Sequence, residues 1–157
     1  MSKSIICTEL VQQAFKMASP HIAQMLKDHA NQTDMAVVIS ATEVINRHNP
    51  DKSFKHNCYL VTGFGDQAKW QLDYEAMALS KAEKSVRTGK SSVNIEAHYL
   101  REGDTPYWGS VVLDDIVVAC SGVESHYDEM FSMWIASTIK ALCKQRVSQL
   151  PQGQHFI

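Results

Sequence analysis

The order of the apolar segments predicts an α+β domain in which helices pack on a central antiparallel sheet. Two observations support this fold class. Apolar residues recur at three- and four-residue steps near both ends of the chain and over residues 67–87, as is typical of helices that cover a core. Short runs rich in β-branched residues lie between these segments and are typical of strands. The predicted order is helix, strands, helix, strands, helix.

The first helical pattern includes Val11, Ala14, Ile22 and Leu26, and Pro20 interrupts it. A proline inside a helix removes a backbone donor and crowds the preceding turn. The helix therefore either kinks at Pro20 or gives way to a second helix that begins there.

Two strands are expected before the middle helix. Residues 35–41 predict a buried strand, and residues 57–65 predict another. Residues 42–47 either extend the first strand or form its partner, and residues 48–53 predict a turn.

The middle helix is predicted over residues 67–87. Its basic end, residues 81–90, is interpreted as solvated surface, because an anion site would rather lie at a helix N-terminus. The apolar face is expected along Leu72, Ala76, Leu79 and Val86.

Three strands are expected in the second half of the chain. Residues 92–100 alternate between apolar and polar side chains and predict a half-exposed strand. Residues 107–113 and 116–120 predict a hairpin with Asp114 and Asp115 in its turn.

The last helix is expected to begin near Glu124 and to present a wide apolar stripe. The stripe consists of Tyr127, Met130, Phe131, Trp134, Ile135, Thr138 and Leu142.

Length and composition indicate one globular domain over residues 1–157, with a frayed tail from about residue 148. The net charge is −2, which argues against a nucleic-acid or membrane-surface protein held by a basic face. The longest apolar runs are far too short to span a bilayer, and no signal peptide is evident. The four cysteines are scattered and form no CxxC motif, so we expect free thiols and a cytoplasmic location.

The segment from Ser121 to Glu129 joins a strand to the last helix. It lacks the first glycine of a nucleophile elbow, so a catalytic Ser121 is disfavoured. The interpretation as a helix cap is stronger: Ser125 caps the helix and Asp128, three residues later, completes a capping box.

No protein-ligated metal site is predicted. His56 and Cys58 are one residue apart and have no companion motif. Cys120 and His126 can be interpreted as a thiolate pair, but Cys120 ends an apolar run and is expected to be buried.

Two segments resemble the GlcG/HbpS-like family of haem-binding and haem-degrading proteins. Residues 76–92 resemble the end of a family helix, and residues 117–139 resemble its closing motif. The matching motif positions, expected to be structural, are Ser121, Gly122, Asp128 and Glu129. The resemblance implies a profilin-like fold with a sheet of about five strands, a homo-oligomer, and an accessory protein that binds haem or a corrinoid.

A candidate ligand site lies in the loop before the hairpin. Tyr and Trp side chains offer apolar plates with polar tips, and an arginine can pair with a carboxylate through two hydrogen bonds. The alternative is that the tryptophan fills the core and the arginine is solvated. The candidate residues are His98, Tyr99, Arg101, Tyr107 and Trp108.

Three functions remain open at the level of sequence. The first is binding of a small molecule, with haem as the candidate cofactor, and the second is a non-catalytic protein-interaction or dimerisation module. An enzyme ranks last because no base, acid and oxyanion donor are paired in the sequence. A buried titratable pair in a cleft would favour the enzyme.

Overall fold

The computed structural model describes residues 4–43 and 52–154. It is an α+β fold built on one sheet, whose strands run in the order β2-β1-β4-β3 with every neighbouring pair antiparallel. The strands are β1 (Met35–Ala41), β2 (Leu60–Phe64), β3 (Ser110–Leu113) and β4 (Ile116–Ser121). The helices are α1 (Thr8–His29), α2 (Phe54–Asn57), α3 (Tyr74–Thr88) and α4 (Ser125–Ser148), with 3-10 turns η2 (Gln67–Lys69), η3 (Ser92–Asn94) and η4 (Ala97–Tyr99).

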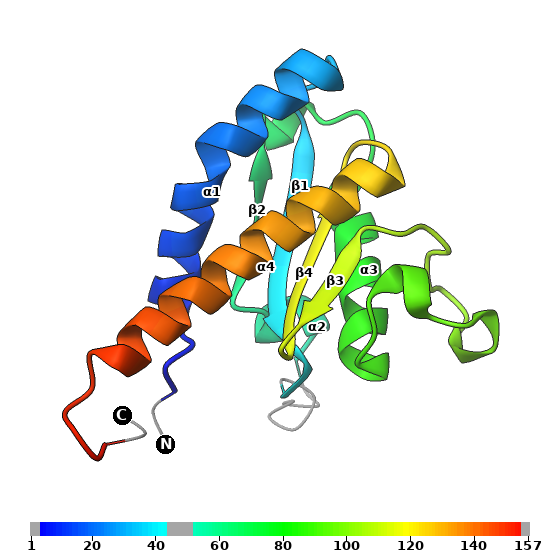
Figure 1. Cartoon of the computed structure of the whole chain (residues 1–157). Coiled ribbons are helices and arrows are strands. Elements are labelled where there is room, and N and C mark those ends of the chain that lie inside the picture. Colours follow the sequence, from blue (N-terminus) through cyan, green and yellow to red (C-terminus); the bar gives the residue numbers. More distant parts are fainter. Residues whose placement is uncertain (1–3, 44–51, 155–157) are drawn as a thin grey trace.

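The helices cover the two faces of the sheet unequally. Helices α1 and α4 pack together on one face, and α3 covers the other (Figure 1). The central strand β1 is buried along its whole length and alternates between the two layers. Val37 and Ile39 face α1 and α4, whereas Ala36 and Val38 face α3.

Helix α1 is continuous through Pro20. Pro20 has no N–H, so the ladder loses one bond at that turn. The Ser19 hydroxyl donates to the Phe15 carbonyl at 2.5 Å within the same stretch. The continuous helix excludes the alternative in which a second helix begins at Pro20.

The predicted strands at 35–41 and within 57–65 are confirmed as β1 and β2. Most of the predicted turn at 48–53 and most of the predicted extension at 42–47 lie outside the described residues. Residues 54–57 form the short helix α2 just before β2.

The prediction for the middle helix was wrong about its start and about its buried face. Helix α3 begins at Tyr74, and the Asp73 side chain caps it by accepting from the Ala76 N–H at 2.9 Å. Leu72 precedes the helix and is 66% exposed. Of the predicted face, Val86 is buried as expected, and the other buried residues of the helix are Ala78, Lys81, Ala82, Lys84 and Ser85. The two lysines that the sequence analysis placed on solvated surface are therefore buried.

The strand predicted over residues 92–100 does not form, and the sheet has four strands rather than about five. This segment folds into the turns η3 and η4. The outer edge of β3 bonds to serine side chains instead of to a strand: the Val112 N–H donates to Ser91 Oγ at 2.9 Å and the Ser110 N–H donates to Ser92 Oγ at 3.1 Å. Hydroxyl acceptors replace the backbone ladder, so no extended partner is needed.

The predicted hairpin is confirmed. Strands β3 and β4 pair from Ser110↔Ala119 to Leu113↔Ile116. Asp114 and Asp115 both adopt positive φ, 48° and 66°, as a two-residue hairpin turn requires.

Helix α4 is confirmed, but its buried stripe is rotated from the predicted one. Phe131, Ile135 and Leu142 are buried as expected. Tyr127, Met130 and Trp134 lie at the border of the core and are only partly covered. The Trp134 ring stacks on His21 at a centroid distance of 4.8 Å, which joins α4 to α1.

Candidate functional site

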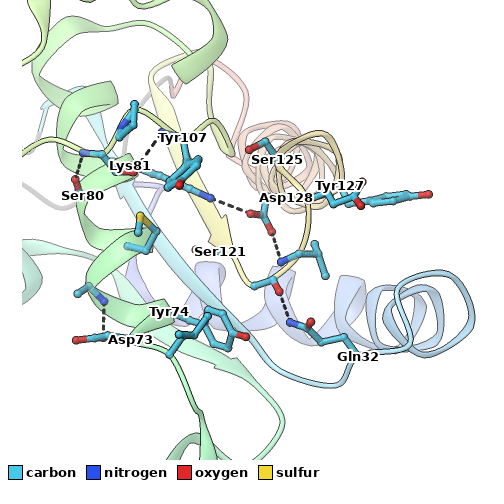
Figure 2. A pocket seen from close by; sticks show the side chains of 18 of the residues that line it. Gln32, Asp73, Tyr74, Ser80, Lys81, Tyr107, Ser121, Ser125, Tyr127 and Asp128 are labelled. Atoms are coloured by element: carbon cyan, nitrogen blue, oxygen red, sulfur yellow. Dashed lines mark hydrogen bonds and ion pairs between the residues drawn. The ribbon is translucent and has the colours of Figure 1, made fainter.

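A pocket of about 1340 Å³ opens where four segments meet (Figure 2). The segments are the end of α1, the start of α3, the loop at residues 103–107 and the turn from β4 into α4. The aromatic lining comes from Tyr74, Tyr107 and Tyr127, one from each of the last three segments.

An ion pair between Lys81 and Asp128 forms part of the pocket wall. Lys81 Nζ lies 2.8 Å from Asp128 Oδ2 and also donates to the Cys120 carbonyl at 3.0 Å. Each side chain is only 2% exposed. Asp128 Oδ1 accepts from the Val123 N–H at 3.2 Å, so this carboxylate ties α3 to the turn that precedes α4. The prediction that Ser125 and Asp128 form a capping box is therefore wrong.

Burial raises the pKa of the Asp128 carboxyl above its usual value, and the Lys81 ammonium opposes this rise. A buried carboxylate without a cation would be costly, whereas this one has both a cation and backbone donors. The pair is therefore held as a unit.

Gly109 makes room for the ion pair. A Cβ at this position would lie 2.8 Å from Lys81 Nζ, from Asp128 Cβ and from the Cys120 carbonyl oxygen. The φ of Gly109 is +133°, which side chains rarely adopt. The Gly109 carbonyl accepts from the Ser132 hydroxyl at 2.6 Å, which fixes the start of β3 against α4.

Lys84 holds the loop that borders the pocket. Its Nζ donates to the Thr105 carbonyl at 2.7 Å and to the Tyr107 carbonyl at 3.0 Å. Burial lowers the pKa of Lys84, and the nearby Asp104 opposes this effect. One turn further along α3, Arg87 pairs with Asp104 at 2.5 Å and braces the start of the same loop.

Ser121 lies at the end of β4, on the face of the sheet that α3 covers. Alternation along β4 places it with Val117 and Ala119, which pack under α3. Its partner in β1 is Ala36. Gly122 follows, and its carbonyl accepts from the Gln32 side chain, which ties the turn to the end of α1.

The structure separates the predicted ligand residues. Tyr107 lines the pocket, while His98, Tyr99, Arg101 and Trp108 do not. Tyr99 and Trp108 are about half exposed, at 53% and 47%, so Trp108 does not fill the core. The His98 and Tyr99 rings pack together at 4.4 Å. Binding at these residues stays a prediction.

Of the motif positions, Ser121, Gly122 and Asp128 line the pocket, and Glu129 does not. The sequence patterns did not predict that Lys81 and Lys84 are buried and hold the pocket walls. A weak signal was present, because the small residues Ala78, Ala82 and Ser85 accompany the lysines and permit close packing.

The other candidates have structural environments. Cys120 is buried, and burial raises the pKa of its thiol to about 12. His126 is exposed on α4 and lies 3.1 Å from Glu124. In the described part of the chain, no group of three His, Cys, Asp or Glu side chains is arranged to hold a metal ion, and all four cysteines are free. None of the helices there is long and apolar enough to cross a membrane.

No protein-family model matches the sequence, and a search of curated proteins also gave no match. Solved structures do share the fold. The Klebsiella pneumoniae protein ORFY, described as a member of the DUF336 family, aligns over 87% of this chain and 91% of its own, with a TM-score of 0.58 and 10% identity. The Ybr137w protein aligns over 84% of this chain and 79% of its own, with a TM-score of 0.54 and 19% identity. At these identities, the similarity shows a common fold.

Proposed function

We propose that this protein binds a small organic molecule in the pocket between α3, the 103–107 loop and the β4–α4 turn. The observation that carries the proposal is the convergence of aromatic and hydroxyl side chains on one cavity. Ligand sites of proteins are concave, mostly apolar and equipped with a few placed polar groups, and this pocket has that composition. The buried ion pair and Lys84 keep its walls in place without a ligand.

A tetrapyrrole is the proposed ligand class, on the strength of the resemblance to GlcG/HbpS-like proteins. The pocket volume of about 1340 Å³ is above the range of roughly 300–1,000 Å³ that is usual for drug-sized ligands. A large flat molecule therefore suits it better than a small metabolite. His29, Met77 and the three tyrosines of the lining are of residue types that can ligate haem iron. We also infer that the chain is a divergent GlcG/HbpS-like protein of the cytoplasm.

The Lys81–Asp128 pair is the kind of buried titratable pair that would favour an enzyme. Its geometry favours a structural role, because Lys81 is engaged by Asp128 and by the Cys120 carbonyl. Both side chains are almost fully covered. An accessory binding protein thus remains the preferred function.

The alternative is a protein-interaction or dimerisation module. It is favoured by the exposed aromatic side chains of Tyr99, Tyr107 and Trp108, which lie close together in the sequence. Such residues are enriched in protein interfaces. Both this alternative and the resemblance to GlcG/HbpS-like proteins imply a homo-oligomer.

Haemin titration, followed by the Soret band, tests the ligand proposal. Ala76 is exposed and lines the pocket, so Ala76→Trp should fill part of the cavity and weaken binding. Met17→Trp, on an exposed part of α1 outside the pocket, is the matched control and should bind like the wild type. Binding that Ala76→Trp leaves unchanged would place the ligand elsewhere.

Failure of the wild type to bind haemin at micromolar concentration would remove the tetrapyrrole. Native mass spectrometry of the purified protein then decides between the two functions, since it reports retained small molecules and subunit number together. An oligomer without any retained molecule would favour the interaction module. In that case Trp108→Ser should shift sedimentation towards the 17.6 kDa monomer.

A further inference from the structure

The Ser121 side chain borders the pocket, although the residue as a whole is only 5% exposed. Its neighbours on the same face of β4 are apolar. Its hydroxyl group forms no hydrogen bond with the described part of the chain and is not sealed inside the core. A hydroxyl group that is open to a cavity can donate a hydrogen bond to a molecule that occupies the cavity.

The N-terminus of α4 borders the pocket next to this hydroxyl. Residues 121–125 all contribute to the lining. The N-cap residue Glu124 makes no side-chain bond to the first turn, in contrast to Asp73, which caps α3. The first N–H groups of a helix have no partner inside the helix. The N–H groups of Ser125 and His126 and the Ser125 hydroxyl are therefore available beside Ser121.

The electrostatic environment at this end of the pocket is set by one ion pair and by the helix dipole. The carboxylate of Asp128 is balanced by Lys81. The dipole of the 24-residue helix α4 adds a positive partial charge at its start.

Besides Asp128, two acidic side chains border the cavity, and each has a partner of its own. Asp73 lies across the pocket from Ser125 (Figure 2), where it is engaged in capping α3. Glu124 points to solvent with 76% exposure and pairs with His126.

We propose that the ligand carries a carboxylate, and that this carboxylate binds between the Ser121 hydroxyl and the first turn of α4. The body of the ligand then lies along Tyr74, Met77 and Tyr107. This inference rests on the proposed function and assigns the polar end of the same pocket.

A carboxylate fits this corner better than a phosphate does. The corner offers hydroxyl and backbone donors, and the ammonium of Lys81 in the lining is already paired with Asp128, so the free donors suit one negative charge. Phosphate sites usually combine a glycine-rich loop with a lysine or arginine that reaches the ligand. Arg101 does not line this pocket.

The test is a two-dimensional NMR titration of the ¹⁵N-labelled full chain with naphthalene-1-acetate and with its neutral amide, naphthalene-1-acetamide. The two probes share the apolar body and differ in the carboxylate. We expect the acid to shift the amide signals of residues 121–126 and to bind about tenfold more tightly than the amide, the scale of hydrogen bonds to a charged group.

Ser121→Ala and Ser125→Ala should each weaken binding of the acid several-fold and leave binding of the amide unchanged. Ser121→Thr keeps the hydroxyl and should retain most of the affinity. Ser137→Ala, on the exposed side of α4, is the matched control and should behave like the wild type.

Equal affinities for acid and amide would overturn the carboxylate site and leave the proposed function standing. Unchanged acid binding in both serine variants would overturn it as well. An acid that causes no shifts at residues 121–126 at millimolar concentration also overturns it. In each of these outcomes, the haemin titration still tests the proposed function independently.

Discussion

The two faces of the sheet are built by different means. On the α1/α4 side the core is almost wholly apolar, and Phe131, Ile135 and Ile139 of α4 belong to one apolar cluster with Val37 and Ile39 of β1. On the α3 side the apolar cluster is small and consists largely of alanines and valines. Lysines and serines are buried around that cluster.

The difference shows how one sheet can carry a rigid core and a pocket together. Apolar side chains pack without directional demands, so the α1/α4 face closes completely. Polar side chains hold their partners at fixed distances and leave gaps between elements that are not closed by packing. Lys81 and Lys84 act in this way, because they bridge α3 to the loop and turn that border the cavity.

The sharpest test of this contrast is removal of the buried cation. Lys81→Met leaves Asp128 buried without its partner and should cost about 3–5 kcal/mol of unfolding free energy, as measured by urea denaturation. Lys140→Met breaks the exposed pair with Asp114 instead and should change the unfolding free energy far less. A cost for Lys81→Met as small as that of the control would contradict the contrast.

The double variant Lys81→Met/Asp128→Leu tests whether the stability lost in Lys81→Met comes from the unpaired charge of Asp128. It replaces both charges by apolar groups and should recover most of the stability lost by Lys81→Met. If the double variant is less stable than the single one, the pair contributes directly to stability beyond satisfying a buried charge.

On the apolar face, truncation of a core aromatic should have an effect of comparable or slightly smaller size. Phe131 is 1% exposed, and Phe131→Ala should cost about 3–5 kcal/mol. Trp134→Ala should also lower the melting temperature, but less, because Trp134 is only partly buried. Met133→Ala, on the exposed side of α4, should stay within about 0.5 kcal/mol of the wild type. A wild-type melting temperature for Phe131→Ala would refute the assigned core.

The serine cluster on the α3 side offers a smaller test. Ser110 Oγ lies 2.7 Å from Ser85 Oγ and is also hydrogen bonded to Ser92 Oγ. Ser110→Ala should cost about 1–3 kcal/mol, because it leaves the buried Ser85 hydroxyl without its partner, whereas Ser92 Oγ still accepts from the N–H of residue 110.

The same substitution should speed hydrogen exchange at the Val112 amide, which donates to Ser91 Oγ on the tethered segment. Ser148→Ala, near the exposed end of α4, should leave that exchange unchanged. Equal protection of Val112 in both variants would show that the serine cluster does not hold the 91–94 segment.

The smallest expected effect concerns pH. Burial raises the pKa of Asp104, but its hydrogen bonds to Arg87 and to the Arg101 N–H outweigh this and bring the pKa below its ordinary value of 3.8. The pair therefore stabilises the fold above pH 3.8 and loses this effect as the pH falls through the lower, folded-state pKa.

Asp104→Asn should be less stable than the wild type at pH 7, and the difference should shrink between pH 4 and pH 2. Thermal melts at several pH values measure it. A difference that stays constant down to pH 2 would exclude a contribution from ionised Asp104.

Sequence patterns predicted the apolar face of this molecule well and the polar face poorly. Helices α1 and α4, strands β1 and β2 and the hairpin follow from apolar periodicity and β-branched runs. The start of α3 and the structure of the segment at 92–100 did not follow from these patterns. At 92–100, alternating side chains suggested a strand, but the hydroxyl groups of Ser91 and Ser92 occupy the edge that such a strand would need.

Of the predicted ligand residues, only Tyr107 lines the pocket, and the other lining residues that were singled out, Ser121, Gly122 and Asp128, were expected to be structural. A lysine near the end of a helix is normally solvated, so the small residues beside Lys81 and Lys84 were only a weak indication of burial. Most of their partners are main-chain carbonyls, which have no sequence signature. A tertiary contact of this kind becomes visible only when the elements are placed.

The close approach at Gly109 restricts how this protein can change over evolution. Any side chain at position 109 would collide with the ammonium of Lys81 and with Asp128, so substitution at one of the three positions demands adjustment at the others. The three residues are 28 and 19 positions apart along the chain. Their joint presence, a lysine in the middle helix, a glycine before the hairpin and an aspartate in the first turn of the last helix, is therefore a criterion for recognising relatives whose overall sequence similarity has faded.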